Sequence, residues 1–235
     1  MKVAVISDIH GNHYALESVL TEARKRKVEK LLILGDIVGY YYHPELVMKM
    51  ISDWDYRLIR GNHEDLLSGL INKTVNEKEL RLKYGSGHNR ALQNLSPSEL
   101  SQLIGAPVQL KVEIGNCKFL MCHGSPWDAD KYIYPDAKPE TLEKCDNEEV
   151  DFVLIGHSHY QFIHNNAHST LINAGSVGQS RALGGVANWV IIVTDDKSVE
   201  LMGTPYDTGK LEKEIDMNDP ELPYLKNILK RGKIE

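Results

Sequence analysis

The sequence contains little cysteine and no long hydrophobic run. Its three cysteines form no CxxC pair and match no zinc-binding spacing. An odd number of widely spaced thiols does not suit a secreted disulfide scaffold and predicts a reducing compartment. No apolar run approaches the roughly 20 residues of a membrane span. The opening MKVAVISDIH lacks the longer apolar region and cleavage site of a signal peptide. We therefore expect a cytoplasmic protein with no membrane association.

The chain also lacks an excess of basic residues. It has 27 Lys and Arg against 33 Asp and Glu, a net charge of -6 with neutral histidines. Binding to duplex nucleic acid usually needs a basic surface, so no such partner is expected. A small phosphorylated substrate such as a nucleotide remains compatible, because local charge can oppose the net charge. The 42% apolar and 26% charged content is typical of a globular protein.

Short apolar runs alternate with amphipathic stretches in the first 60 residues. They predict strands at 2–7, 30–34 and 56–60, with helices at 13–27 and 44–51. This βαβαβ order predicts a parallel sheet with right-handed crossovers. The rest of the chain predicts helices at 77–92, 98–104 and 138–144, and strands at 108–114, 118–122, 152–155, 161–164, 170–173, 189–194 and 199–203. We expect one domain over 1–235, with a helical tail from about 207 to 235.

Five of the apolar runs end directly in side chains of the kinds that bind metal ions. In chain order, these side chains are Asp8 with His10, Asp36, Asn62 with His63, His123, and His157 with His159. Functional groups in open α/β sheets gather outside the carboxyl ends of the strands, so we expect these clusters at one edge of the sheet. A single DxH or HxH is a weak signal. Five clusters after strand ends indicate a metal site.

The types of side chain narrow the choice of metal. Imidazole, carboxylate and amide oxygen without thiolate favour Mn, Fe, Zn, Co or Ni over a pure Mg or Ca site. The candidates are too many for one ion, so two divalent ions that share a carboxylate are expected. Two-metal hydrolases hold their ions about 3.5–4 Å apart and contact the attacking and leaving oxygens of a displacement at phosphorus. The site would attract a phosphate ester despite the net charge of the protein.

The order of these motifs resembles the calcineurin-like metallophosphoesterases. The residues read DxH, GD, GNHE, CHG and GHSH between Asp8 and His159, and NAGSVGQ at 173–179 is similar to small bacterial and archaeal members. The resemblance implies an α/β fold, a four-layer α/β/β/α sandwich with mixed sheets. It also implies a dinuclear-metal phosphodiesterase, with manganese as the expected ion.

The resemblance further implies a role for each matching residue. One metal would be held by Asp8, His10, Asp36 and His159, and the other by Asp36, Asn62, His123 and His157, with Asp36 bridging. A hydroxide on the metals would attack phosphorus in line. His63 would contact the phosphate and protonate the leaving oxygen as a general acid. The alternative for His63 is a residue that only orients a metal ligand.

The second motif departs from related families. Protein phosphatases and symmetrical dinucleoside tetraphosphatases carry GDxVDRG where this chain reads GDIVGYYYHP. Gly39 stands where their aspartate partner of the acid histidine would be, and the arginine is missing. This departure argues against a Ser/Thr protein phosphatase and favours a diester over a monoester dianion. Arg60, Arg90 or Arg181 could supply positive charge from elsewhere.

Four side chains are candidates for substrate binding: Arg60, Tyr42, Trp127 and Arg181. Several aromatic side chains lie in loops after the motifs and could stack on a nucleobase or simply pack. They are Tyr40, Tyr41, Tyr42, Trp127, Tyr132 and Tyr134. Five histidines outside the clusters are expected at the surface or in packing: His13, His43, His88, His164 and His168. Glu64 is expected to complement a helix dipole.

Three functions are compatible with the sequence. The leading prediction is hydrolysis of a phosphodiester. The alternative within the same chemistry is a dinucleoside polyphosphate or nucleotide phosphohydrolase. The alternative of another class is a non-catalytic interaction scaffold with the same fold. The presence of His63 and of the complete ligand set argues against the scaffold.

Overall fold

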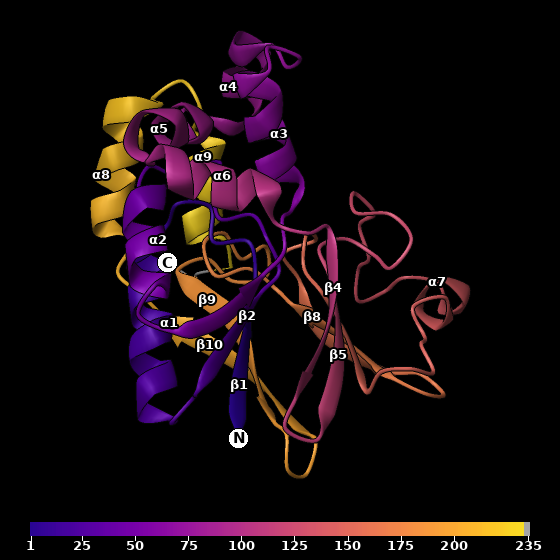
Figure 1. Ribbon diagram of the computed structural model, residues 1–235. Helices are drawn as coiled ribbons and strands as arrows, with labels where there is room; N and C mark the ends of the chain where they lie inside the picture. Colours follow the sequence, from indigo (N-terminus) through magenta and orange to yellow (C-terminus); the bar gives the residue numbers. More distant parts are fainter. Residues whose placement is uncertain (233–235) are drawn as a thin grey trace.

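The computed structural model describes residues 1–232 and contains two five-stranded sheets (Figure 1). The first sheet has the order β10-β9-β1-β2-β3. Its strands are β1 (Lys2–Ile6), β2 (Lys30–Ile33), β3 (Asp55–Leu58), β9 (Val186–Val193) and β10 (Ser198–Pro205). Strands β1, β2 and β3 run parallel to one another. Strand β9 pairs antiparallel with both β1 and β10. The predicted βαβαβ unit is therefore confirmed.

The second sheet has the order β4-β5-β6-β8-β7. Its strands are β4 (Gln109–Ile114), β5 (Cys117–Cys122), β6 (Phe152–Ile155), β7 (Gln161–Asn165) and β8 (Thr170–Ala174). Strands β5, β6 and β8 are parallel, and the two edge strands pair antiparallel with them. Both sheets are thus mixed, with the parallel strands at one side of the first sheet and in the middle of the second.

Two hydrophobic layers hold the sheets in place. Ala4 and Ile6 point from β1 toward the helices, while Val3 and Val5 point toward the second sheet, as the alternation of a strand requires. The helices that bury apolar side chains on the first layer are α1 (His13–Lys25), α2 (Pro44–Ile51), α3 (Asn62–Ile71), α5 (Gly87–Asn94) and α6 (Pro97–Gly105). A short α7 (Pro139–Glu143) and its loops cover the far face of the second sheet. The four-layer α/β/β/α sandwich is confirmed (Figure 1).

The predicted helix at 77–92 is wrong, because the structure contains two helices there. Helix α4 spans Glu77–Tyr84 and ends at Gly85, whose φ of 74° and ψ of -168° cannot occur within an α-helix. Helix α5 begins two residues later, at Gly87. The break matters for the site because it turns the first residues of α5 toward the loop that follows β2.

The C-terminal segment packs on that same loop. It contains α8 (Gly209–Asn218), α9 (Tyr224–Asn227) and a 3-10 turn (Ile228–Lys230). Their apolar side chains bury the consecutive tyrosines at 40–42. The last three residues of the predicted tail, 233–235, lie outside the described part of the chain. Among residues 1–232, no helix is both long and apolar enough to cross a membrane.

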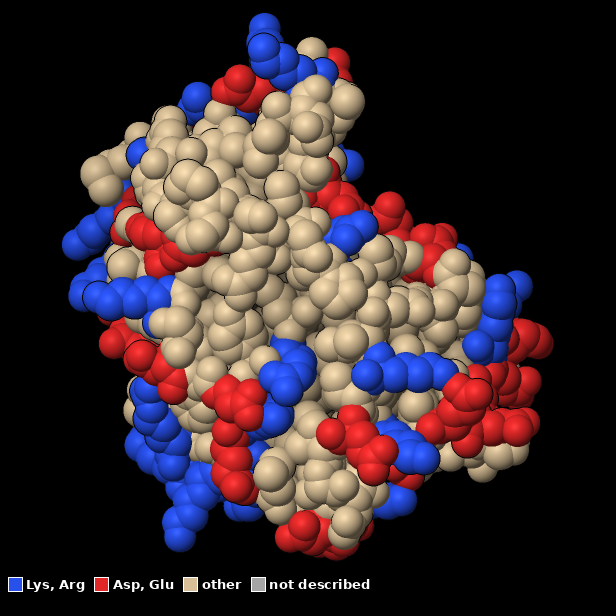
Figure 2. Space-filling model, viewed as in Figure 1, with Lys and Arg blue, Asp and Glu red and all other residues tan. Residues whose placement is uncertain are grey.

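Charges of both signs are intermixed on the face shown in Figure 2. Basic and acidic side chains lie mainly around its rim, and the middle of the face carries fewer of them. Several exposed charges pair locally, for example Lys30 with Asp55 at 2.7 Å.

Candidate metal centre

The carboxyl ends of both sheets meet at one buried cluster of carboxylates and imidazoles. Strands β1, β2 and β3 of the first sheet lead to Asp8, His10, Asp36 and Asn62, and strands β5 and β6 of the second lead to His123, His157 and His159. The expectation of a single sheet edge is therefore corrected, because two sheets contribute. The Asp8 Oδ1 lies 3.1 Å from His159 Nε2, and the Asp36 Oδ2 lies 3.3 Å from His123 Nε2.

The backbone is strained at most of these positions. Asp8, His10, Asp36, His157 and His159 all have left-handed φ values, between 53° and 62°. Such a conformation is uncommon for residues with a Cβ and costs of order 1 kcal/mol each. It occurs where the chain turns sharply off a strand and the side chain must point inward. The concentration of strain at one cluster is typical of a functional site.

Four imidazoles have one nitrogen fixed by a backbone carbonyl. The Nδ1 atoms of His10, His123 and His159 lie 3.0, 2.7 and 2.8 Å from carbonyl oxygens, and His157 Nε2 lies 3.2 Å from another. A carbonyl can only accept, so each of these nitrogens donates its N–H. The other nitrogen of each neutral ring therefore carries a lone pair that points into the cluster.

These lone pairs face one another at close range. His10 Nε2 lies 3.2 Å from His159 Nε2, and His123 Nε2 lies 3.1 Å from His157 Nδ1. In the neutral form neither pair has a proton to share, so two lone pairs repel unless a cation lies near them. Asp8 Oδ1 is also buried and has no hydrogen-bond partner within residues 1–232. The donor set fits divalent cations, and the second nitrogen of each histidine is held as in known metal sites.

Among the described residues, three overlapping groups of ligand atoms are close enough to hold an ion. The first is Asp8, His10 and His159, the second is Asp36, His123 and His157, and in the third His63 joins His10 and Asp36. Asn62 joins the second group, because its Oδ1 lies 3.1 Å from His123 Nε2. Asp36 lies between the groups, since its Oδ2 is also 3.9 Å from His10 Nε2.

The pKa values reflect this crowding. Burial lowers the pKa of His10 to about 4, so the ring is neutral and able to bind a cation at pH 7. Burial alone would also lower the pKa of His123, but the carboxylates of Asp36 and Asp8 raise it to about 10. A cation that binds His123 must therefore displace a proton. The neighbouring histidines keep the pKa of Asp36 well below its usual range.

Glu64 has a larger role than its sequence position predicted. Its carboxylate is buried and accepts four backbone N–H groups, from Gly61 and Asp36 at Oε2 and from Ile37 and Val38 at Oε1. These bonds join the start of α3 to the loop after β2, which carries Asp36. A glutamate three residues after the helix N-cap Gly61 is half of a capping box, a signal the sequence contained.

His63 lies beside the cluster and is surrounded by the rings of other side chains. Its ring centroid is 4.8 Å from that of His10, 5.0 Å from Tyr40 and 4.7 Å from Tyr84. Its Nδ1 lies 3.2 Å from Nε2 of His88. His88, expected at the surface or in packing, is fully buried and packs against His63. No local pattern marks His88, because its partner lies 25 positions earlier.

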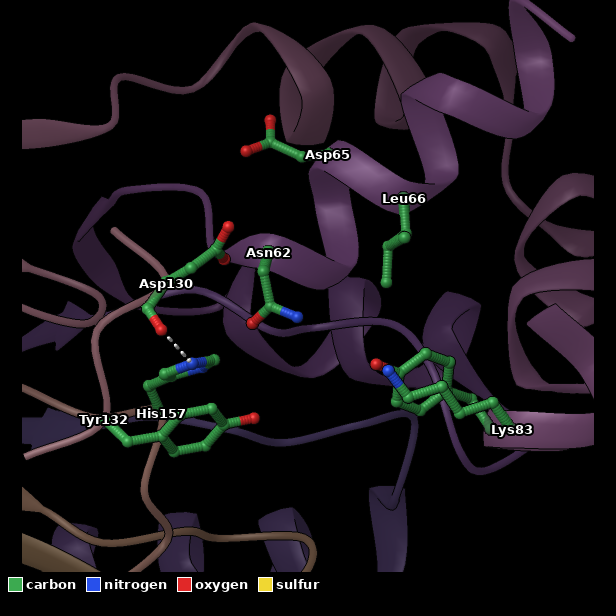
Figure 3. Close-up of a pocket in the computed structure, with 8 residues that line it drawn as sticks. Asn62, Asp65, Leu66, Lys83, Asp130, Tyr132 and His157 are labelled. Atoms are coloured by element: carbon green, nitrogen blue, oxygen red, sulfur yellow. Dashed lines mark hydrogen bonds between the residues drawn. The ribbon is translucent and has the colours of Figure 1, made fainter. Parts of the chain in front are cut away.

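A cavity of about 380 Å³ opens beside the cluster (Figure 3). Asn62 and Leu66 of α3 lie on one side, and Lys83 lies across the cavity from Tyr132. The Tyr132 ring stacks on His157, with centroids 3.9 Å apart. Three further side chains complete the lining: Asp65, Tyr84 and Asp130. Lys83 and Tyr84 were not foreseen, because they stand at the end of α4, far from any motif.

The four candidates for substrate binding lie in different surroundings. Tyr42 is only 2% exposed and packs against the C-terminal helices, which argues against stacking on a base. Trp127 packs on the far side of the second sheet, with Lys144 over its ring. Arg60 Nε donates to Asp65 at 2.8 Å. Arg181 lines a separate cavity of about 400 Å³ with Tyr40.

The fold and the cluster define the class of protein. Two mixed sheets in a four-layer sandwich, with carboxylates and imidazoles gathered at the strand ends, are the architecture of the metallophosphoesterases. Residues 1–197 match the family model of the calcineurin-like phosphoesterase superfamily domain. The chain belongs to this family, which supports a phosphoester hydrolase.

Similar proteins share the fold over nearly the whole chain. An uncharacterized protein of Methanocaldococcus jannaschii is 29% identical over 234 residues, which cover 92% of each chain. The crystal structure of a hypothetical protein from Pyrococcus horikoshii has a TM-score of 0.84 and 23% identity, over 100% of this chain and 99% of that one. A metallophosphoesterase from Sphaerobacter thermophilus has a TM-score of 0.74 and 23% identity, over 98% of both chains.

Proposed function

We propose that this protein hydrolyses phosphodiesters at a centre of two divalent metal ions. The observation that carries the proposal is the set of imidazole lone pairs that face one another around Asp8 and Asp36. We assign one ion to Asp8, His10, Asp36 and His159, and the other to Asp36, Asn62, His123 and His157. When bound, such ions lower the pKa of water and neutralise charge on the phosphate. Manganese is the ion we would test first.

His63 is the proposed general acid. In the part of the chain that the structure describes, no backbone carbonyl fixes a ring nitrogen of His63, and its Nδ1 pairs with His88 instead. Its Nε2 is therefore the nitrogen left to face a substrate. As the bond from phosphorus to the leaving oxygen breaks, the proton on Nε2 passes to that oxygen.

The charges around the cavity favour a diester over a monoester. Lys83 is the basic side chain of the lining, and Asp65 and Asp130 are acidic. Arg60 is engaged by Asp65 and by the Ala106 carbonyl. A monoester dianion usually needs more positive charge around its phosphoryl group than this arrangement supplies. A diester carries one negative charge and two organic groups, which suit the mixed lining.

The test compares hydrolysis of bis(p-nitrophenyl) phosphate and p-nitrophenyl phosphate by metal-stripped protein with added Mn²⁺. We expect Mn²⁺ to restore activity, with the diester as the better substrate. Asp36→Asn should lose at least about 100-fold in kcat/KM, because both ions share this carboxylate. His63→Ala should lose about 100-fold or more. Unchanged turnover in Asp36→Asn would exclude the two-metal mechanism.

The amount of bound metal distinguishes an acid role of His63 from a ligand role. His63 also offers an atom within 4.8 Å of atoms of His10 and Asp36, so it is a candidate for an extra ligand in the cluster. If His63 is the acid, His63→Ala keeps the wild-type metal content. If it is a ligand, the variant binds less metal. Wild-type protein that binds no Mn, Fe or Zn on titration would instead support a non-catalytic scaffold.

Exposed tyrosines favour a nucleotide as the second candidate substrate. Tyr132 is 43% exposed, and its ring is nearly parallel to that of Tyr134, with centroids 6.0 Å apart. Tyr132 lines the cavity and Tyr134 lies next to Tyr132. Base–aromatic stacking contributes about 1–3 kcal/mol per base. If the substrate is a dinucleoside polyphosphate or another nucleotide, Tyr134→Ala should raise KM for it and leave bis(p-nitrophenyl) phosphate nearly unaffected, because Tyr134 stacks on Tyr132 and does not line the catalytic cavity. Chromatography of the products would show which bond is cut.

A further inference from the structure

His88 forms a pair with His63 that no sequence pattern predicts. The two rings are nearly parallel, at 8°, with centroids 5.0 Å apart. Nδ1 of His63 and Nε2 of His88 are 3.2 Å apart, within hydrogen-bond distance. The side chain of His88 is fully buried, so water does not compete for this bond. The contact fixes both the position and the rotation of the His63 ring.

The loop after β2 leaves no room for a side-chain partner at Gly39. A Cβ built on Gly39 would lie 2.1 Å from Nδ1 of His63, too close for any side chain without movement. Gly39 also has a φ of 90°, which disfavours residues with a Cβ. A partner for His63 must therefore come from another element. The break between α4 and α5 places His88 in the first turn of α5 to supply it.

The start of α5 is itself fixed in place. Ser86, its N-cap, donates from its backbone N and from Oγ to the Asp219 carboxylate, at 2.9 and 2.8 Å. His88 stands two residues further along. A side chain held in this way loses little additional entropy when it pairs with His63.

The pairing leaves a buried polar atom of His88 unsatisfied, which lowers the stability of the folded protein. Nδ1 of His88 is buried and has no hydrogen-bond partner among the described residues. An unsatisfied buried polar atom costs about 1–3 kcal/mol, and an apolar residue of similar size would avoid that cost. Buried unsatisfied groups in native proteins commonly mark a functional constraint.

We propose that His88 is a positioning residue that holds His63 with its Nε2 directed at the leaving group, in place of a carboxylate partner. The proposal rests on the proposed role of His63 as the acid. Nε2 of His88 lies 3.2 Å from Nδ1 of His63 and accepts its N–H, which leaves Nε2 of His63 to carry the proton for the leaving oxygen. The Nε2 proton of His63 then passes to the leaving oxygen as its bond to phosphorus breaks. Water supplies the new oxygen on phosphorus, and its released proton restores His63.

The test uses a matched pair of variants. In His88→Gln the amide can still bond to His63 Nδ1, whereas His88→Leu has a similar volume and cannot. Each is assayed on two methyl aryl phosphodiesters, one releasing p-nitrophenolate and one releasing unsubstituted phenolate. An acid matters more for phenolate, the more basic leaving group.

We expect His88→Leu to lower kcat at least about 10-fold on the phenyl ester and less than about 3-fold on the nitrophenyl ester. KM and metal content should stay near wild type, and His88→Gln should recover part of the loss. Equal losses on both esters, or no loss on either, would overturn the proposal. So would a His63→Ala variant that shows no dependence on the leaving group.

A measurement without turnover keeps the inference separate from the proposed function. Failure of wild-type protein to hydrolyse either ester with any divalent ion would reject the proposed function. Ring-nitrogen NMR would still test the pair. We expect the Nδ1 signal of His63 to show a hydrogen bond in wild type and in His88→Gln, and to lose it in His88→Leu. Identical His63 signals in all three proteins would show that the pair does not exist in solution.

Discussion

Individual side chains at this centre are held by backbone groups more than by one another. The histidines donate to main-chain carbonyls, and Glu64 accepts from the main chain of two loops. A backbone partner fixes a ring without adding a charge that would compete for a cation. The left-handed residues add strain, which the surrounding hydrogen bonds offset. Removal of one such bond should therefore affect folding before it affects chemistry.

Glu64→Ala should be strongly destabilising. The change leaves four buried N–H groups without their acceptor, and each unsatisfied donor costs about 1–3 kcal/mol before relaxation. We expect the free energy of unfolding to fall by at least about 3 kcal/mol. Urea unfolding in the presence of a chelator measures this loss without a contribution from bound metal.

Glu79→Ala provides the control. Glu79 lies in the first turn of α4, like Glu64 in α3, but its side chain is exposed. This variant should change the free energy of unfolding by less than about 0.5 kcal/mol. Comparable losses in the two variants would contradict the role assigned to the Glu64 carboxylate.

At the scale of elements, the site depends on how strands and helices end. Each metal-binding loop leaves the carboxyl end of a parallel strand, and α4 ends at Gly85 where the next helix changes direction. Helix α8 stabilises that break from the other end of the chain. Its C-cap Asp219 is fully buried and bonds to Ser86, and the Arg81 guanidinium lies 3.7 Å from its other oxygen.

Asp219→Ala should loosen the junction between α4 and α5. The variant removes two hydrogen bonds to a charged acceptor and leaves the buried Ser86 N–H unsatisfied. We expect a loss of about 2–3 kcal/mol in the free energy of unfolding, measured by urea denaturation. Glu221→Ala is the matched control, because Glu221 also approaches Arg81, at 3.6 Å, but is 48% exposed. A loss in Glu221→Ala as large as that in Asp219→Ala would refute this account.

At the scale of the whole molecule, the proposed cations would join the two sheets. Asp8 and His10 come from the first sheet and His159 from the second, and Asp36 and His123 are divided in the same way. Each proposed ion would thus bind side chains from both sheets. Metal binding should therefore stabilise the packing of one sheet against the other.

We expect Mn²⁺ to raise the melting temperature of chelator-treated protein. Free Mn²⁺ at 100 times its Kd would contribute about 2.7 kcal/mol, which corresponds to roughly 5–11 °C for a chain of this size. Calorimetry with and without Mn²⁺ measures the shift. In Asp36→Asn the shift should be much smaller. Equal melting temperatures for stripped and Mn²⁺-treated wild type would argue against metal binding at the junction.

The sequence by itself determined the family, the order of the strands and the residues at the strand ends. These features depend on local patterns, namely apolar runs of strand length and the short motifs that follow them. It did not determine that two sheets contribute to one cluster. It also predicted one helix at 77–92, whereas the first of the two helices there ends at Gly85, which has a φ of 74°.

Only the tertiary structure decided which nitrogen of each histidine faces inward, and which side chains surround His63. His88, Lys83 and Tyr84 reach the site from helices whose own sequence carries no metal-binding motif. Tyr42, which follows a motif directly, is buried by helices more than 160 positions away. Long-range packing determines such contacts, and neither local periodicity nor motif spacing records it.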